Sequence, residues 1–323
     1  MKIGVLALDD VFDLGLAAVL DALRTANELI PASGLSITPF DVRVVGVRAR
    51  VRTSQGLRVP VQHRATWAAD CVVVPAIGFK MPGPLAAALE RPDVRDAAAV
   101  LRERSPRTRL IAAACIGTFV LAESGALAGE SATTTWWLST MFRQRYPDVR
   151  LDHSRMIVQS GRFVTAGAAL SHMDLALWLI RSVSPQLAEL TARYLIVDAR
   201  PSQSAYALSD HLVHSDDVVR RFEAWARGRL ESGFSLGDAA RSVGASERTL
   251  SRHLQTVLGK SPLAYFQTLR VERAVHLLKT TSASVDEVAT QIGYADGATL
   301  RALLRRTLRT GVREIRGTAA ALR

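Results

Sequence analysis

The sequence predicts two domains of different fold class: a doubly wound α/β domain over about the first two hundred residues and an all-α domain after it. Three observations support this division. Short apolar or β-branched runs alternate with helix-like segments as far as residue 200. The last hundred or so residues contain one helix-turn-helix pattern twice. The 323 residues also suffice for two domains, at roughly 150 residues per domain.

Each strand of the first domain is predicted from a short apolar run that ends near a turn residue. The run Cys71–Val74, closed by Pro75, is continuous rather than alternating, which is typical of a strand buried on both faces of a parallel sheet. The expected strands are residues 3–8, 41–47, 71–74, 110–114 and 163–166, with a short extended piece at 59–61.

Helices are predicted between these strands from apolar residues at helical spacing. Within 85–104, Pro92 implies a break or a new helix start, because proline disrupts a helix interior. The expected helices are residues 14–29, 85–104, 118–124, 173–183 and 187–199. The predicted boundaries are 1–200 for the α/β domain, 201–217 for a polar linker, 218–318 for the helical domain and 319–323 for a tail.

The basic charge of the chain is concentrated in the helical domain. The whole chain has 41 basic and 30 acidic residues, a net charge of +11. Residues 218–323 hold 18 of the basic and 9 of the acidic ones, net +9, which leaves 23 and 21, net +2, for the remainder. This asymmetry is expected where a domain meets a polyanion such as double-stranded DNA.

Cysteine content and hydropathy predict a cytoplasmic, nucleoid-associated protein that does not enter the membrane. Two cysteines are too few for a disulfide framework, which fits a reducing compartment. The apolar run at the N-terminus meets Asp9 too soon to form a signal-peptide core. No run reaches the roughly 18 apolar residues of a membrane span.

The repeated pattern consists of a capped helix, a turn at a glycine and a second helix. In each copy a serine precedes an acidic residue by three positions, the arrangement of a capping box. The glycine can supply the positive φ that a tight turn requires. The serine–acid pairs are Ser235 with Asp238 and Ser284 with Glu287, and the glycines are Gly244 and Gly293.

The second helix of the first copy has the composition of a DNA-reading helix. It is expected to start at Ser246, a good N-cap, and to turn an apolar stripe that includes Leu250 and Leu254 toward the core. Arginine can bond guanine edges with a bidentate fork, and threonine or serine can contact bases or phosphates. The expected DNA-contacting residues of this helix are Arg248, Thr249, Ser251 and Arg252.

A known pattern is matched in order over about eighty residues, at Ala240, Gly244, 246–252, 259–262, 270–274, 277–278, 288–289 and 293–296. Through these residues the stretch 236–316 resembles the DNA-binding domain of AraC/XylS-type transcription regulators. The resemblance implies two recognition helices in successive major grooves on one face of the DNA. A connecting helix at 263–278, preceded by Pro262, would hold them apart.

The second copy departs from the family pattern. The family usually has an aromatic residue and an arginine in the last recognition helix, where this chain has Leu300 and Ala302. The leucine is interpreted as alternative core packing. The arginines of this helix are expected to hold phosphates, which position a protein without specifying sequence; they are Arg301, Arg305 and Arg306.

A cysteine stands at the turn between a buried strand and a helix, in the segment 114–117. Such an elbow is expected to expose Cys115, and the helix N-terminus favours its thiolate. With the segments 3–13, 75–78 and 133–136, this turn resembles PfpI-type members of the class I glutamine-amidotransferase-like superfamily. That resemblance implies a flavodoxin-like fold over about residues 1–190. Joined to an AraC-type domain, it is the layout of GlxA-like transcription regulators.

Enzymatic relatives have a histidine shortly after the elbow helix, and a cysteine hydrolase needs such a base. This chain has Thr135 at that position, and its other histidines match no family motif. His172 is expected to serve in capping or packing, and Asp13 to approach Cys115 without replacing the base. A protein that is not an enzyme is therefore predicted, with no cofactor and no metal. The alternative is a cysteine-dependent hydrolase or amidase with an accessory DNA-binding domain.

The sequence thus predicts a transcription regulator whose N-terminal domain binds a small effector and forms a homodimer. Dimerisation alone and thiol redox sensing stay open as alternatives for that domain. RNA polymerase is an expected partner if the protein is an activator. Cys71, within its strand, is expected to be a buried small hydrophobe. The expected effector pocket comprises Asp13, Gly78, Cys115, Ile116 and Thr135.

Overall fold

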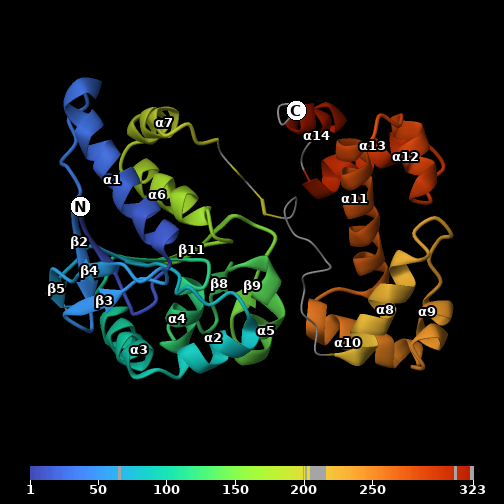
Figure 1. Ribbon diagram of the computed structural model, residues 1–323, viewed down its shortest axis with the longest axis horizontal. Coiled ribbons are helices and arrows are strands. Elements are labelled where there is room, and N and C mark those ends of the chain that lie inside the picture. Colours follow the sequence, from blue (N-terminus) through green and yellow to red (C-terminus); the bar gives the residue numbers. More distant parts are fainter. Residues whose placement is uncertain (65–66, 199, 201, 204–215, 309–310, 321–323) are drawn as a thin grey trace. The chain divides into compact units, whose positions relative to one another are not determined.

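The computed structural model describes residues 1–323 apart from 65–66, 199, 201, 204–215, 309–310 and 321–323. The chain divides into two compact units, Met1–Ser204 and Ala205–Arg323 (Figure 1). Most of the expected linker at 201–217, and residues 321–323 of the expected tail, lie outside the described residues.

A seven-stranded sheet forms the centre of the first unit. Its strand order is β10-β11-β7-β6-β1-β2-β5, and every neighbouring pair is parallel except β10 with β11. This arrangement confirms the predicted doubly wound α/β fold. The strands are β1 (Lys2–Leu6), β2 (Asp41–Gly46), β5 (His63–Arg64), β6 (Cys71–Val74), β7 (Leu110–Ala114), β10 (Ile157–Ser160) and β11 (Phe163–Ala166).

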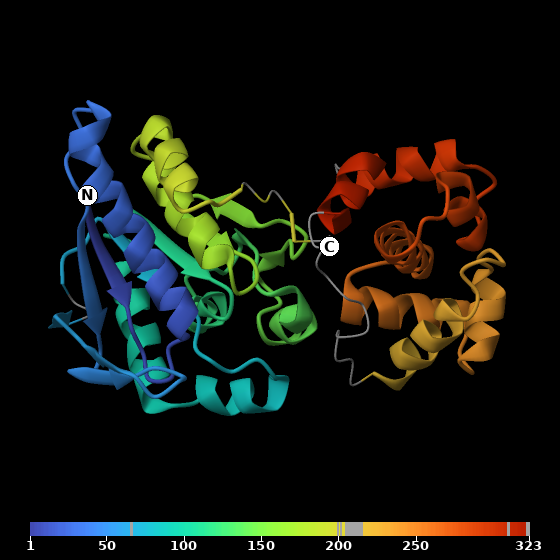
Figure 2. The ribbon, with the colours of Figure 1, turned by 45° about the horizontal axis from the view of Figure 1, so that its top comes forward.

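Helices cover both faces of the sheet, because alternate strand residues point to opposite sides and both sides are apolar. Val5 and Val73 pack toward one helix layer, whereas Val72 and Val74 pack toward the other. The two helix layers lie on opposite sides of the sheet (Figures 1 and 2). The first layer consists of α1 (Asp13–Ser33), α6 (Ser171–Arg181) and α7 (Pro185–Tyr194). The second consists of α2 (Pro82–Leu89), α3 (Pro92–Arg104) and α4 (Gly117–Glu123).

The expected elements of this unit are present, with shifts at their ends and some additions. The helix break expected at Pro92 is confirmed, because α2 ends at Leu89 and α3 begins at Pro92. The helix expected to end at residue 199 ends at Tyr194. The extended piece expected at 59–61 belongs to a hairpin of β3 (Arg50–Arg52) and β4 (Arg58–Pro60). Unpredicted short elements are β8 (Ser131–Ala132), η1 (Trp136–Leu138), α5 (Ser139–Arg145) and β9 (Arg150–Leu151).

The described part of the second unit is helical and has two separate hydrophobic cores, one for each copy of the repeated pattern. We name its halves the first lobe (α8, α9, α10 and residues 262–269 of α11) and the second lobe (residues 271–280 of α11 with α12, α13 and α14). The helices are α8 (Asp217–Arg227), α9 (Leu236–Ser242), α10 (Glu247–Leu258), α11 (Pro262–Thr280), α12 (Val285–Gln291), α13 (Gly297–Leu308) and α14 (Val312–Ala320).

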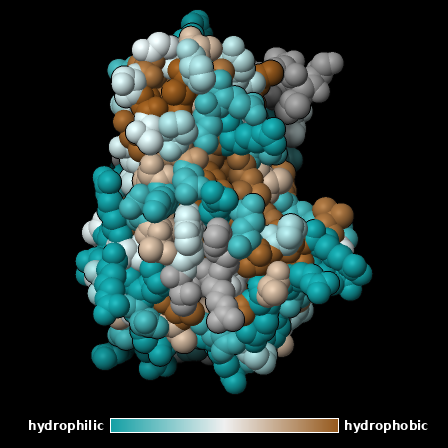
Figure 3. Space-filling model, turned by 90° about the vertical axis from the view of Figure 1, so that its left-hand side faces the viewer, coloured by the Kyte–Doolittle hydropathy of each residue, from teal (hydrophilic) through white to brown (hydrophobic). Residues whose placement is uncertain are grey.

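Among the described residues, no helix is both long and apolar enough to span a membrane. Figure 3 shows one face of the molecule, on which hydrophilic residues predominate and hydrophobic residues form separate patches. In the first unit, large hydrophobic side chains that remain exposed include Leu57, Met81 and Ile196.

Candidate functional site

The recognition helix of the first lobe, α10, starts where the sequence predicted. Ser246 is its N-cap, and the Ser246 hydroxyl accepts a hydrogen bond from the backbone N–H of Thr249 at 3.1 Å. Gly244 has the expected positive φ of 67° in the preceding turn. The side of α10 that carries Leu250 and Leu254 is buried in the core of the first lobe. The opposite side therefore faces solvent, as base reading requires.

The two arginines of α10 are exposed and carry no hydrogen bond or ion pair to the described residues. Arg248 and Arg252 are therefore available to a ligand from outside the chain. Thr249 is less available, because its hydroxyl lies 2.8 Å from that of Ser246 within the cap. Ser251 is half-buried. Of the four residues of α10 that were predicted to contact DNA, the two arginines are therefore the most exposed.

A contact that the sequence did not predict joins α10 to the start of α8. The Nδ1 atom of His253 lies 2.7 Å from Oδ2 of Asp216. The other carboxylate oxygen of Asp216 accepts the backbone N–H groups of Val218 and Val219 and so caps α8. Asp216 stands just before an apolar series at helical spacing, so its capping role was readable from the sequence, but its contact with His253 was not.

The recognition helix of the second lobe, α13, follows the other capped helix. Ser284 and Glu287 form the complete capping box that was predicted. In the first lobe the predicted box is only half made: Ser235 accepts from the N–H of Asp238, but the Asp238 carboxylate pairs with Arg241 instead. The free arginine three residues later offered a stronger partner than a backbone amide.

The second recognition helix has exposed arginines, but none of them stands at the position where the family usually has one. Leu300 is fully buried in the second lobe, which supports the interpretation of core packing. Ala302 is exposed and offers no polar group. The three arginines that were predicted to contact phosphates from this helix are exposed, and none of them carries a hydrogen bond or ion pair to the described residues. They are Arg301, Arg305 and Arg306.

In the first unit, loops that follow different strands meet at the carboxyl end of the sheet. The backbone N–H of Phe12 donates to the carbonyl of Ala76 at 2.8 Å, and that of Gly78 donates to the carbonyl of Asp10 at 2.7 Å. The hydroxyl of Thr134 donates to the Cys115 carbonyl at 2.7 Å. These bonds bring together the loops after β1 and β6, and join the elbow after β7 to the segment after β8.

One oxygen of the Asp13 carboxylate is held and the other is not. Oδ2 accepts hydrogen bonds from the Ser54 hydroxyl at 2.8 Å and the Gln55 N–H at 3.0 Å, whereas buried Oδ1 has no partner among the described residues. Burial acts to raise the pKa of this carboxyl, but the polar groups of Thr53, Ser54 and Gln55 beside it hold the pKa below its usual value. Gly78 is required beside them, because a Cβ there would overlap Ser54.

The elbow cysteine is buried, so the expectation of an exposed, thiolate-favouring Cys115 is wrong. Only 3% of the residue is exposed, in a backbone with φ of 56°. Burial raises the pKa of the thiol to about 12, which outweighs the hydrogen bond from Ile116 and the positive charge of Lys80. The neighbouring Ile116 is buried as well. Cys71 is fully buried, as expected, and burial raises its pKa to about 12 too.

Several buried hydroxyls near these loops have no hydrogen-bond partner in the described part of the chain. Thr135, which stands where enzymatic relatives have histidine, is fully buried and its Oγ1 is unpaired. Thr118, after the elbow, and Ser171, after β11, are in the same condition. With Oδ1 of Asp13, they are the four unpaired buried side-chain atoms in the described part of the first unit. Asp13, Thr118 and Ser171 lie in segments that follow β1, β7 and β11 of the sheet. Thr135 follows β8 of a separate two-stranded sheet, next to the Thr134 hydroxyl that donates to the elbow.

His172 is a packing residue, as expected, and both of its ring nitrogens are occupied. Nε2 accepts the N–H of Ala76 at 3.1 Å, so Nδ1 carries the proton and donates to the Ala169 carbonyl at 2.6 Å. Complete burial lowers the pKa of His172 to about 4 and outweighs the bond to Ala169. The imidazole also fills the space in which a Cβ at Gly15 would lie.

Because the pKa of His172 is depressed on folding, the protein should lose stability in mild acid. Below about pH 6.5 the unfolded state takes up a proton that the folded state refuses until about pH 4. We expect the free energy of unfolding to fall by on the order of 2 kcal/mol between about pH 7 and about pH 5 from this residue. Urea unfolding at the two pH values, with His172→Gln as the control, measures it. An equal loss in both proteins would contradict the assignment.

Comparison with known proteins agrees with this architecture. The model of the DJ-1/PfpI family matches residues 1–182, and that of a helix-turn-helix domain matches residues 239–317. The HTH-type transcriptional regulator GbdR of Pseudomonas aeruginosa is 28% identical over 301 residues, 91% of this chain and 78% of that protein. The transcriptional activator RhaS of Enterobacter sp. strain 638 is 33% identical over 128 residues, 40% of this chain and 45% of that protein.

One solved structure has a similar fold over a little more than half of this chain. The crystal structure of an AraC family transcriptional regulator from Pseudomonas putida aligns with a TM-score of 0.50 at 19% identity, over 60% of this chain and 98% of that one. The α/β sheet with its elbow, the paired helix-turn-helix lobes and the matches over both units lead to one assignment. The chain belongs to the DJ-1/PfpI family and is a transcription regulator of the AraC family, with a DJ-1/PfpI domain followed by a helix-turn-helix DNA-binding domain.

Proposed function

We propose that the DJ-1/PfpI domain of this regulator binds a small effector at the carboxyl ends of β1, β6, β7 and β11. Open α/β sheets bind ligands at this edge of the sheet. The observation that carries the proposal is a set of buried polar atoms without a partner among the described residues: Oδ1 of Asp13 and the hydroxyls of Thr118 and Ser171, which follow β1, β7 and β11, and that of Thr135, which follows β8 beside the elbow. Buried polar atoms are nearly always paired, so their partners are expected to come from a ligand. Such an effector would present hydrogen-bond donors to Asp13.

The same geometry favours binding over catalysis. Cys115 is protonated at neutral pH, and a thiol with a pKa near 12 is a poor nucleophile and a poor redox sensor. A general base would have to accept its proton, yet Thr135 has no basic group. His172 is neutral, with both nitrogens already bonded. These points weigh against the cysteine hydrolase and against thiol redox sensing.

In the DNA-binding domain we propose that α10 reads bases and that α13 mainly positions the protein on phosphates. Arg248 and Arg252 support the first role because both residues are exposed and form no hydrogen bond or ion pair with the residues described by the structure. We further propose that the protein acts as a homodimer, for which the exposed hydrophobic side chains of the first unit offer contact area. RNA polymerase would be an additional partner if the protein activates transcription.

Replacing Thr135 with valine tests the effector site. The hydroxyl has no partner among the residues that the structure describes, so Thr135→Val should keep or raise the stability of the free protein, by up to about 1 kcal/mol, while weakening effector binding. The matched control is Thr191→Val, which removes a buried hydroxyl that donates to the Leu187 carbonyl. It should cost about 1 kcal/mol and leave effector binding unchanged.

Thermal shift of the full chain against a panel of small metabolites provides the measurement, first for the wild type and then for both variants. Compounds that stabilise the wild type identify the effector class. The site would be misplaced if Thr135→Val kept the full thermal shift of the wild type with those compounds.

A further inference from the structure

The two lobes of the DNA-binding unit share one helix but no hydrophobic core. Tyr265, Phe266 and Leu269 of α11 belong to the core of the first lobe. The core of the second lobe contains four later residues of the same helix, namely Val271, Ala274, Leu277 and Leu278. The residue between the two sets is Arg270, which is only 8% exposed. A buried cation therefore occupies the junction of the lobes.

The guanidinium group of Arg270 contacts both lobes. Its Cζ lies 4.9 Å from the ring centre of Phe266, in the first lobe, and 5.0 Å from that of Tyr294, in the second. Its Nε donates to the backbone carbonyl of Leu230, in the loop after α8, at 2.9 Å. Stacking on two rings with a directed hydrogen bond is a task to which a planar guanidinium is suited and an ammonium is not.

The turn of the second lobe approaches the same point so closely that only glycine fits. Gly293 has a φ of 78°, and a Cβ there would lie 2.6 Å from the Leu230 carbonyl oxygen and 2.8 Å from that of Glu231, besides overlapping Arg270. The equivalent turn glycine of the first lobe, Gly244, has open space within 4 Å of its would-be Cβ. Gly293 thus serves the contact between the lobes as well as its turn.

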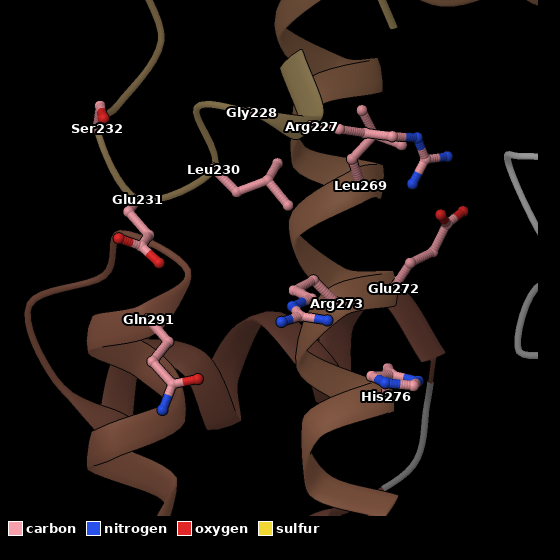
Figure 4. A pocket seen from close by; sticks show the side chains of 10 residues that line it. All are labelled: Arg227, Gly228, Leu230, Glu231, Ser232, Leu269, Glu272, Arg273, His276 and Gln291. Atoms are coloured by element: carbon pink, nitrogen blue, oxygen red, sulfur yellow. The ribbon is translucent and has the colours of Figure 1, made fainter. Parts of the chain in front are cut away.

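Beside this contact the lobes stand apart. A cavity of 570 Å³ lies between the loop after α8 and the helices α11 and α12. Figure 4 shows Leu230 and Glu231 on the loop side of this space, with Gln291 of α12 and Arg273 of α11 facing it. Apolar side chains do not fill this space, so beside it the two lobes are joined by the contacts of Arg270.

We propose that Arg270, with the Leu230 carbonyl, Gly293 and Tyr294, is a latch that fixes the distance and angle between the recognition helices α10 and α13. Arg270 is a positioning residue, because it contacts both lobes and is itself buried. With the latch closed, the two helices meet DNA at one spacing. This inference rests on the proposed roles of α10 and α13 in binding DNA.

The distance between the recognition helices can be measured without DNA. Gln255 of α10 and Thr307 of α13 are exposed and can be replaced by cysteine for spin labels. The native Cys71 and Cys115 are buried and protonated, so the unsubstituted chain serves as the labelling blank. Pulsed electron paramagnetic resonance on the full chain then reports the distribution of label distances.

We expect one narrow distribution in the wild-type background and a broadened or shifted one in Arg270→Met. Arg270→Lys, which keeps the charge but loses the planar fork, should broaden it less. The control is Arg273→Met, which removes the same charge from an exposed position on the same helix and should change nothing. A wild-type distribution in folded Arg270→Met would overturn the proposal. If Arg270→Met does not fold, Tyr294→Leu decides in the same way, because it removes only the second ring.

DNA binding gives an independent readout. The probe is DNA selected by the wild-type chain from a random library, with one base pair then inserted between the two contacted segments. We expect the insertion to weaken wild-type binding by about tenfold, because the two lobes can no longer engage together, and to weaken Arg270→Met binding less. An equal penalty in both proteins would count against the latch. If the insertion did not change wild-type binding, the proposed recognition roles of α10 and α13 would be refuted. The measured label distances would still test the latch, because they do not depend on DNA.

Discussion

Replacing both Arg248 and Arg252 with alanine is expected to remove most of the sequence preference of the protein for DNA and leave its fold intact. Both residues are exposed, so their loss opens no cavity, and it leaves no described residue without a bonding partner. Each bidentate base contact is worth about 1–3 kcal/mol of discrimination, so the pair should cost about 2–6 kcal/mol if the two contacts are independent. Footprinting of the wild type identifies operator DNA, and fluorescence anisotropy then compares both proteins on operator and unrelated DNA.

The control for that experiment lies in the second lobe. Arg305→Ala removes one exposed arginine from α13 and should weaken binding to operator and unrelated DNA alike, with a shallower salt dependence. A double variant of α10 that still preferred operator DNA would exclude α10 as the base reader. An Arg305→Ala variant with altered preference alone would show that α13 reads bases after all.

Replacing Gly117 with alanine is expected to prevent stable folding of the DJ-1/PfpI domain. A Cβ at this position would lie less than 3.0 Å from the backbone carbonyl oxygens of both Val74 and Pro75. These atoms end a central strand and cannot move aside as a flexible side chain can. We expect a loss on the order of 4 kcal/mol or more, in the range reserved for severe core defects.

The matched control is Gly83→Ala in the first turn of α2, where a Cβ meets nothing within 4 Å. That variant should be neutral or up to about 1 kcal/mol more stable, because alanine restricts the unfolded chain. Chemical unfolding of the full chain followed by tryptophan fluorescence compares the two, since Trp136 and Trp137 lie in the first unit. Equal midpoints for Gly117→Ala and wild type would mean that the elbow has room for a side chain.

The central strands were predictable because burial on both faces of the sheet restricts which residues they can contain. Strands β6, β7 and β11 begin and end at the predicted residues, since strands buried on both faces consist mostly of apolar residues. The edge strand β10 has partly exposed residues, so Ile157–Ser160 shows no such run. The helix α8 was missed although Val219, Phe222 and Ala226 have helical spacing, because the polar residues before it resembled a linker.

The grouping of Asp13, Gly78 and Cys115 was implied by the resemblance to PfpI-type proteins, and its role in effector binding stays a prediction. The structure places the three residues after β1, β6 and β7, whose carboxyl ends lie at one edge of the sheet. The burial of Cys115 depends on how α4 and its neighbours pack over the elbow, and a strand–turn–helix pattern does not encode that packing. Arg270 looked like one more basic residue of a helix, because its partners Leu230 and Tyr294 lie far from it in sequence.

The bond between Asp216 and His253 has a consequence for how the two halves of this protein communicate. Asp216 is the first described residue of the DNA-binding unit, and its one carboxylate both starts α8 and holds the recognition helix. A pull or rotation delivered through the chain before Asp216 would therefore act next to Arg252, one of the two arginines that we propose contact DNA. An effector that alters the strain at this entry point would act on the first lobe directly, and the operator affinity it changes would feed back on effector affinity by the same factor.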